Sequence, residues 1–321
     1  MARVKLGVMG CADIARRSMI PAIKFLPDKF DLVAVASRTE DKAALFAKEF
    51  TCKSVVGYDN LLKEDIEAVY IPLPTGLHDE WINKALLAGK HVYAEKSIAY
   101  SYDATKGMVQ NAKAKNLSLM EGFMFQYHTQ HQIVTELIKS GGIGETRCFR
   151  SSFGFPPLSA SNFRYDNELG GGVVFDAAGY TVRAVHFILG KDYEVVSSSL
   201  FFDEAFGSHT YGSAFLKGRN GVGAQIAFGF DNFYQCNYEV WGSKGKITVD
   251  RAFTPGPDFS PTIVLETVKE RKIIAAEKCN HFVNAMNVFH DLVTIAKNRD
   301  KHYEDILLQS KSLEKIIKLS K

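Results

Sequence analysis

The sequence lacks the features that mark membrane proteins and nucleic-acid-binding proteins. A transmembrane helix requires about 18 consecutive apolar residues, and no stretch of this sequence comes near that length. The formal net charge is only +3, which gives no argument for a nucleic-acid or membrane-surface partner. The chain contains no internal repeat and no low-complexity segment. We therefore expect an ordinary globular protein with neither kind of partner.

Cysteine is also scarce. The five cysteines are scattered and no two form a C-x-x-C motif, so the sequence predicts neither a disulfide framework nor a zinc site. Four histidines in two pairs, His128 with His131 and His281 with His290, lack companion ligands at metal-binding spacing, which favours ordinary helix residues. Residues 1–3 run directly into an apolar strand and leave no room for a signal peptide. We expect a cytoplasmic protein without a bound metal.

What the sequence does contain is an alternation of strand and helix. Its 321 residues, 46% hydrophobic, are enough for two domains. Apolar strands are expected at residues 4–8, 31–37, 53–56, 68–72, 91–94 and 118–121, and helices at 41–50, 59–62, 78–88 and 105–115. Such a pattern indicates a parallel sheet covered on both faces. Residues 1–123 are therefore predicted to form a doubly wound α/β Rossmann domain that binds a dinucleotide.

Beyond residue 123 the pattern becomes that of an α+β domain. Helices are expected at 130–140, 174–189, 281–297 and 304–318. Strand-like segments at 147–153, 194–202, 211–216, 222–230 and 237–249 dominate the rest, and the last contains a hairpin turn at 242–245. Residues 124–321 are predicted to form a substrate-binding and oligomerisation domain with a large, mostly antiparallel open sheet. Its C-terminal helix is able to pack back on the first domain.

The first strand leads through a glycine turn into a helical pattern. A connection of this kind cradles phosphate, because backbone N–H groups point at the ligand and the helix dipole favours negative charge. The spacing is G-x-x-G, and Ala12 stands where a third glycine is usual. The residues predicted to contact the cofactor here are Gly7, Gly10, Cys11, Ala12, Asp13 and Ile14. The alternative is a strand–turn–helix without a ligand.

The end of the second strand selects the cofactor. NAD-binding folds carry an acidic residue there, whereas this chain has Arg38 between Ser37 and Thr39, whose hydroxyls would donate to a phosphate, and Lys42 lies one helical turn on. A guanidinium pairs with a 2′-phosphate and stacks on adenine, so we predict NADP(H) in preference to NAD(H). In the alternative, Arg38 is a solvated loop charge. Glu40 or Asp41 would repel a phosphate if either pointed inward.

Two further segments carry candidate chemistry. Lys96 follows the fifth strand at the carboxyl edge of the sheet, where it would hold a carbonyl oxygen as it becomes an alkoxide. Asp176, Tyr180 and Arg183 follow a glycine triplet and share one face if their segment is helical. A phenol donates a proton to an alkoxide, and Asp176 would orient it or bind a sugar hydroxyl. The alternatives are a surface lysine, a core tyrosine and a helix-capping aspartate.

The motifs together resemble a known family. They are the stretch from Gly7 to Ala15, the Pro72-Leu73-Pro74-Thr75 loop with His78, the pair Glu95-Lys96, and Gly170 to Gly172 leading to Asp176 and Tyr180. In this order they resemble the glucose–fructose oxidoreductase / inositol dehydrogenase (Gfo/Idh/MocA) family over nearly the whole chain. The segments 73–81, 120–125 and 241–255 are most similar to those of the 3-ketoreductases of dTDP-deoxysugar biosynthesis.

The resemblance implies NADPH-dependent reduction of a keto group, at C3, on a nucleotide-linked deoxysugar. Lys96 matches the family's catalytic lysine, Tyr180 takes a position where many relatives carry histidine, and Ser97 replaces a proline. Asp176 is the third catalytic candidate. Further cofactor contacts are expected from Pro72, Leu73, Pro74, His78, Glu95 and Lys96, and substrate contacts from Arg164, Tyr165, Tyr180 and Arg183.

Two other functions are compatible with the same motifs and candidate residues. One is an NAD(P)-dependent dehydrogenase that oxidises a free sugar, inositol or another polyol. The other is an NAD(P)-binding regulator without turnover, although a regulator needs only the phosphate cradle and not Lys96 or Tyr180. The open sheet predicts a homodimer or homotetramer.

Overall fold

The computed structural model describes residues 3–320, so the first two residues, on which the N-terminal expectation partly rests, lie outside the described part. The chain divides into two compact units. One unit comprises the chain up to Gly122 together with Phe282–Ser310. The other comprises Phe123–His281 together with the chain from Lys311 onward.

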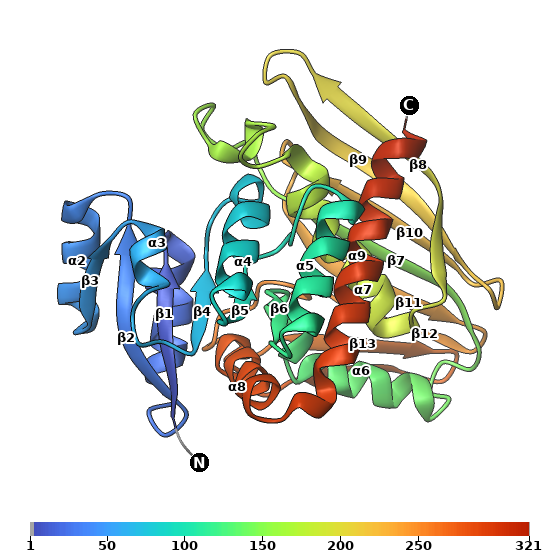
Figure 1. Ribbon diagram of the computed structural model, residues 1–321. Helices are drawn as coiled ribbons and strands as arrows, with labels where there is room; N and C mark the ends of the chain where they lie inside the picture. The colour runs from blue at the N-terminus through green and yellow to red at the C-terminus, as the bar shows by residue number, and fades with distance from the viewer. Residues whose placement is uncertain (1–2, 321) are drawn as a thin grey trace. The chain divides into compact units, whose positions relative to one another are not determined.

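The first unit is built on a parallel six-stranded sheet in the order β3-β2-β1-β4-β5-β6. Its strands are β1 (Val4–Met9), β2 (Phe30–Ser37), β3 (Lys53–Val56), β4 (Ala68–Ile71), β5 (His91–Ala94) and β6 (Leu119–Glu121). Its helices include α1 (Ile20–Lys24), α2 (Glu40–Phe50), α3 (Tyr58–Leu61), α4 (His78–Leu87), α5 (Tyr102–Ala114) and α8 (His281–Thr294). The strand order reverses at β1, which confirms the doubly wound arrangement (Figure 1).

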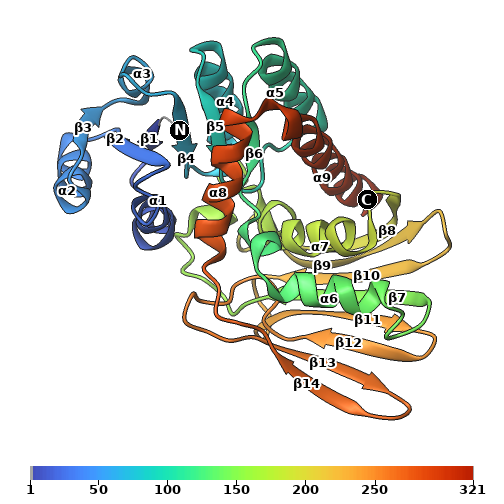
Figure 2. The same cartoon turned by 90° about the horizontal axis from the view of Figure 1, so that it is seen from below.

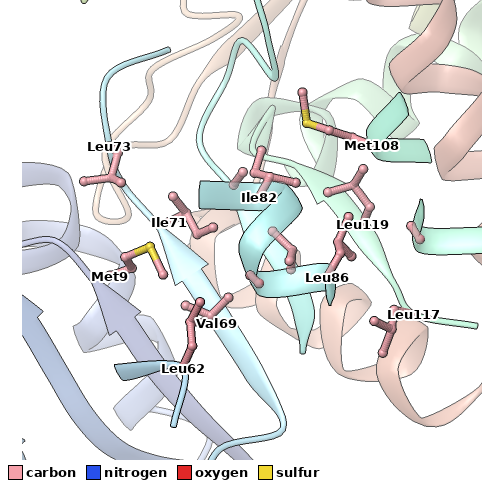
Figure 3. Close-up of a cluster of buried hydrophobic side chains, with 14 of the residues drawn as sticks. Met9, Leu62, Val69, Ile71, Leu73, Ile82, Leu86, Met108, Leu117 and Leu119 are labelled. Atoms are coloured by element: carbon pink, nitrogen blue, oxygen red, sulfur yellow. The ribbon is translucent and has the colours of Figure 1, made fainter. Parts of the chain in front are cut away.

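A buried apolar cluster fixes the strands that carry the site loops. Val69 and Ile71 of β4 pack with Ile82 and Leu86 of α4 and with Met108 of α5 (Figure 3). Each such side chain, when fully buried, contributes about 1.5–3 kcal/mol to folding. The carboxyl ends of β4 and β5 therefore start from a rigid core.

Residues 282–310 group with the first unit, although they follow residue 123, where the sequence predicts the domain boundary, with only the C-terminal helix able to pack back. The reason is aromatic packing against the parallel sheet. Phe289 of α8 stacks on Phe30 of β2 with ring centroids 6.5 Å apart, and it meets Tyr93 of β5 edge-on at 5.5 Å. The last helix, α9 (Arg299–Leu319), is divided between the units at Ser310.

The second unit contains an eight-stranded sheet in the order β14-β13-β12-β11-β7-β10-β9-β8. Its strands are β7 (Thr146–Gly154), β8 (Tyr193–Asp203), β9 (Ser208–Gly218), β10 (Gly223–Gly229), β11 (Gln235–Gly242), β12 (Gly245–Val249), β13 (Thr262–Thr267) and β14 (Arg271–Ala275). All neighbours pair antiparallel except β7 and β10, which are parallel. The mostly antiparallel sheet is thus confirmed, but β13 and β14 were not expected.

Helices cover one face of this sheet. The helices α6 (Gln130–Lys139) and α7 (Gly179–Leu189) lie on the same side, and α7 packs on β7 and β10 (Figure 2). The other face is open and holds a hollow of about 560 Å³ whose lining includes Ser197, Ser213 and Gln225. The second unit therefore keeps a helix-covered side and an uncovered side.

Candidate active site

The glycine turn after β1 brings the backbone close to two other loops. Gly10 has φ +125°, and its N–H donates to the carbonyl of Ala36 at 2.9 Å. A Cβ atom at Gly10 would lie 2.9 Å from Cδ2 of Leu73. The chain is helical from residue 13 to 24, with a π-helical turn at Ala15–Met19. Only glycine suits both the conformation and the space at this position.

A cavity of about 190 Å³ opens at this turn, at the carboxyl ends of β1, β2 and β4. The residues around it are Gly10, Cys11, Ala12, Ser37, Arg38, Thr39, Lys42, Tyr58, Pro72, Leu73 and Pro74. Ten of them were predicted as cofactor contacts, and Tyr58 was not. Gly7, by contrast, sits within β1 against Leu61 and Ile66. Asp13 and Ile14 begin the helix and do not line this cavity.

The cavity carries positive charge at its β2 side. Arg38 and Lys42 are exposed, and neither forms an ion pair within residues 3–320. Ser37 is buried, and its hydroxyl accepts a hydrogen bond from the N–H of Thr39 at 3.3 Å. Burial raises the pKa of the Cys11 thiol to about 11, so this side chain is neutral at pH 7. Two cations and one buried hydroxyl suit a phosphate group at this end.

Lys96 leaves the sheet directly after β5. Its neighbour Glu95 accepts a hydrogen bond from the Tyr70 hydroxyl at 2.7 Å, and Lys96 itself is half-buried. The peptide bond between Lys96 and Ser97 is cis. The N–H of Ile98 then donates to Oε1 of Glu121 at 2.9 Å. Hydrogen bonds on both sides thus hold the loop in which Lys96 sits.

His78 lies beneath this loop and is completely buried. Its Nδ1 is 2.8 Å from the carbonyl oxygen of Ser97, and its Nε2 is 2.8 Å from that of Leu73. Burial lowers the pKa of His78 to about 4, while these carbonyl contacts act in the opposite direction. The His78 side chain therefore connects the loop after β4 with the loop after β5. It would affect a bound cofactor only by positioning these two loops.

The other candidates lie in the second unit, around the start of α7. A π-helical turn, Val174–Ala178, precedes α7, so Asp176 and Tyr180 are not separated by a regular α-helical turn. Asp176 accepts a hydrogen bond from Nε of Arg164 at 2.8 Å. The pKa of Arg164 is raised, chiefly by the charge of Asp176 and in smaller part by Tyr180. Arg164 and Asp176 therefore form a charged pair whose electrostatic influence extends to Tyr180.

Tyr180 is 8% exposed and stands among phenylalanines. Its ring centroid is 4.7 Å from that of Phe153 and 5.7 Å from those of Phe123 and Phe253. Its hydroxyl is 4.0 Å from Sδ of Met124. This aromatic surround was not foreseen, although several of its members fall in the motifs at 120–125 and 241–255.

Arg183 and Tyr165 lie at the edges of this cluster. The Nε of Arg183 donates to Oε1 of Gln126 at 3.2 Å, and its guanidinium carbon lies 5.6 Å from the ring centroid of Phe123. The ring of Tyr165 stacks on Phe206 at 4.2 Å, and its hydroxyl accepts from the N–H of Leu158 at 3.1 Å. Arg183 is thus oriented by side chains around Tyr180, whereas Tyr165 is oriented by the loop after β7 and the turn between β8 and β9.

Two further properties concern the described chain as a whole. Within residues 3–320, no group of three or more His, Cys, Asp and Glu side chains is placed to hold a metal ion. Nor is any described helix both long enough and apolar enough to cross a membrane.

Comparison with known proteins gives consistent matches over most of the chain. A dTDP-3,4-didehydro-2,6-dideoxy-alpha-D-glucose 3-reductase from Saccharopolyspora spinosa is 43% identical, over 88% of this chain and 86% of that protein. The crystal structure of the 3-ketoreductase KijD10 from Actinomadura kijaniata, in complex with NADP and TDP-benzene, superposes with a TM-score of 0.96 at 36% identity. It covers 99% of this chain and 98% of that one.

A third relative has a different activity in its name. A D-xylose 1-dehydrogenase (NADP(+)) from Haloferax volcanii is 32% identical, over 81% of this chain and 80% of that protein. Residues 4–123 match the family model of the oxidoreductase NAD-binding Rossmann fold, and residues 131–248 match the GFO/IDH/MocA C-terminal domain. The chain belongs to the Gfo/Idh/MocA family of oxidoreductases.

Proposed function

We propose that this protein catalyses the NADPH-dependent reduction of a keto group, at C3, on a dTDP-linked deoxysugar. The observation that carries the proposal is the full-length likeness to 3-ketoreductases, at 36% identity and a TM-score of 0.96 for the structure that contains NADP and TDP-benzene. The 43% identity to a dTDP-sugar 3-reductase supports it independently. Lys96 and Tyr180, the two groups that such a reduction needs, are both present.

The residues at the glycine turn fit NADP(H). Gly10 leaves no room for a Cβ beside Leu73, as expected where backbone approaches a pyrophosphate. Arg38 and Lys42 would hold the 2′-phosphate, and Ser37 would hydrogen-bond to it. Among the residues that the structure describes, no carboxylate lines the cavity where an NAD-binding fold places one for the ribose. The fit supports NADP(H) over NAD(H).

Each catalytic candidate has a separate task. When bound, NADPH supplies the hydride that is added to the ketone carbon. Lys96 donates a hydrogen bond to the carbonyl oxygen and stabilises the negative charge that this oxygen gains in the transition state. Tyr180 donates its proton to the same oxygen to complete the alcohol. Asp176, paired with Arg164, either orients Tyr180 or binds a hydroxyl of the sugar.

One experiment tests the proposal directly. The oxidation of enzyme-bound NADPH is followed by absorbance after rapid mixing with a dTDP-linked 3-keto deoxysugar. We expect K96A to slow the single-turnover rate by roughly 100-fold or more, the usual effect of removing a charge-stabilising donor. K115M, which removes an exposed lysine of the same unit, should react at the wild-type rate. A K96A rate equal to wild type would remove Lys96 from the mechanism.

The same assay separates the alternatives. NADP⁺ reduction with D-xylose, but no NADPH oxidation with the keto sugar, would favour a free-sugar dehydrogenase like the Haloferax relative. NADPH binding with neither reaction would favour a regulator without turnover. Tyr180→Phe should lower the rate by roughly tenfold or more, because a general acid contributes at least that much.

Location and assembly form part of the proposal. The five cysteines are free thiols, which supports a reducing cytoplasmic environment. The uncovered face of the second sheet carries exposed aromatic side chains, including Phe201 and Tyr211 stacked at 4.6 Å. Such a surface supports a homodimer or homotetramer, which light scattering during gel filtration would measure.

A further inference from the structure

Arg251 follows β12 in the second unit and is held by aromatic groups. Its guanidinium carbon lies 5.2 Å from the ring centroid of Tyr234 and 5.6 Å from that of Phe259. Its Nη1 donates to the Tyr234 hydroxyl at 2.7 Å, and that oxygen is 3.1 Å from Oγ1 of Thr254. Two rings and one hydrogen bond thus fix the orientation of a half-buried cation.

No carboxylate in the described part of the chain pairs with this cation. Arg251 forms no ion pair with any residue between 3 and 320, although Asp250 and Asp258 are near it in the sequence. Arg164, by contrast, donates to Asp176 at 2.8 Å. A guanidinium has five N–H donors, and the described residues use only one of those of Arg251. The remaining donors are available to an anion with the fork geometry of a phosphate.

The position of Arg251 relates it to Tyr180. Arg251 comes two residues before Phe253, whose ring centroid is 5.7 Å from that of Tyr180. Two residues of extended chain span roughly 7 Å at most. Arg251 and Tyr180 therefore lie in one region of the second unit. In a nucleotide-linked sugar the diphosphate is bonded directly to the sugar, so one substrate molecule would contact both residues.

One exposed aromatic ring lies beside the cation, and a second adjoins its partner Tyr234 in the sequence. Phe233, which precedes Tyr234, is 87% exposed, and Phe259 is 44% exposed. Such exposed rings are able to contact a ligand that the cation binds. A nucleobase stacks readily on such rings, because every base has an aromatic face.

We propose that Arg251 binds the diphosphate of a nucleoside diphosphate and that Phe233 and Phe259 stack on its base. This inference rests on the proposed function, since it assigns the nucleotide portion of that substrate to specific side chains. It makes Arg251 a determinant of specificity for nucleotide-linked over free sugars. It also gives a role to part of the D-R-A-F-T-P motif, of which Phe253 already borders Tyr180.

The test measures binding without turnover. Calorimetric titrations of the NADP⁺-saturated enzyme use dTDP, inorganic pyrophosphate and thymidine as separate probes. We expect R251Q to weaken dTDP and pyrophosphate by roughly tenfold or more, with little effect on thymidine. F233A should weaken dTDP and thymidine by roughly threefold or more and spare pyrophosphate. R219Q, at an exposed turn between β9 and β10, removes the same charge and should bind all probes like wild type.

Several outcomes decide between this inference and the proposed function. If R251Q keeps wild-type dTDP affinity while wild type reduces the dTDP-linked keto sugar, the inference fails and the proposed function stands. If wild type binds dTDP and R251Q does not, but no keto sugar is reduced, the inference stands and the proposed function fails. If R251Q no longer binds NADP⁺, or no longer shows a cooperative melting transition, the titrations are carried out with R251K instead. R251K lacks the planar fork, so a wild-type dTDP affinity for it would overturn the inference.

Discussion

At the scale of single residues, His78 shows how a buried side chain serves a site that it does not line. Its ring nitrogens each lie 2.8 Å from a carbonyl oxygen, one in the loop after β4 and one in the loop after β5. The second of these oxygens belongs to Ser97, next to Lys96. A neutral ring donates to one carbonyl only, and the ring as a whole fills the space between the loops.

We therefore expect His78→Phe to lower both stability and turnover. Losing the hydrogen bond leaves a buried carbonyl without its donor, which costs about 1–3 kcal/mol, and the urea midpoint should fall accordingly. The single-turnover rate should fall as well, while the KM for the keto sugar changes little, because Lys96 is displaced and the substrate contacts are not. His78→Asn keeps one amide donor and should recover part of both. Equal turnover in wild type and His78→Phe would show that the ring does not position Lys96.

The same scale shows what the sequence could predict about the site. Ten of the cavity residues were predicted as cofactor contacts, because Rossmann chemistry ties their position to strand ends. Tyr58 was not predicted, since nothing in its local pattern indicates that it faces the turn after β1. Arg164 and Asp176 were both named as candidates, but their pairing follows from the fold of the loop after β7.

At the scale of elements, strands with a regular apolar pattern were predicted well, whereas strands and side chains whose position depends on tertiary contacts were not. The strands of the first sheet fall within a residue or so of their expected bounds, because buried parallel strands read as short apolar runs. The hairpin of β13 and β14 was missed: β14 is an edge strand with exposed charged residues such as Arg271 and Lys272. The buried Arg299 was also missed, although it donates to the carbonyls of Leu292 and Val293 at the end of α8.

The histidines around α6 predict how stability depends on pH. His131 of α6 accepts a hydrogen bond from the Tyr238 hydroxyl of β11 at 2.8 Å, and its Nε2 donates to the Ala252 carbonyl at 3.1 Å. Burial lowers the pKa of His131 and of His281 to about 3, and that of His128 to about 4. An unfolded histidine titrates near ~6.5. Between pH 6.5 and 4 the unfolded chain thus binds protons that the folded chain does not.

The free energy of unfolding should therefore fall as the pH is lowered through this window. Urea midpoints at pH 7, 5.5 and 4.5 measure the fall, and potentiometry gives the protons taken up on unfolding. His131→Gln should be less stable at pH 7, because it loses the Tyr238 contact, but its stability should depend less steeply on pH. Midpoints that stay constant from pH 7 to 4.5 would contradict this assignment of neutral buried histidines.

At the scale of the whole molecule, cofactor binding and stability are linked, because a ligand that binds only the folded chain raises its melting temperature. Arg38 and Lys42 are the two cations at the cavity, and the 2′-phosphate distinguishes NADPH from NADH. At equal concentrations NADPH should therefore raise the melting temperature more than NADH. In R38A the difference between the melting-temperature shifts with NADPH and NADH should narrow. The reason is that each tenfold loss in NADPH affinity removes about 1.4 kcal/mol of binding free energy. K48A removes an exposed lysine farther along α2 and should keep the wild-type difference. Equal shifts with both cofactors in wild type would mean that the two cations face solvent rather than a phosphate, and that the end of β2 does not select the cofactor.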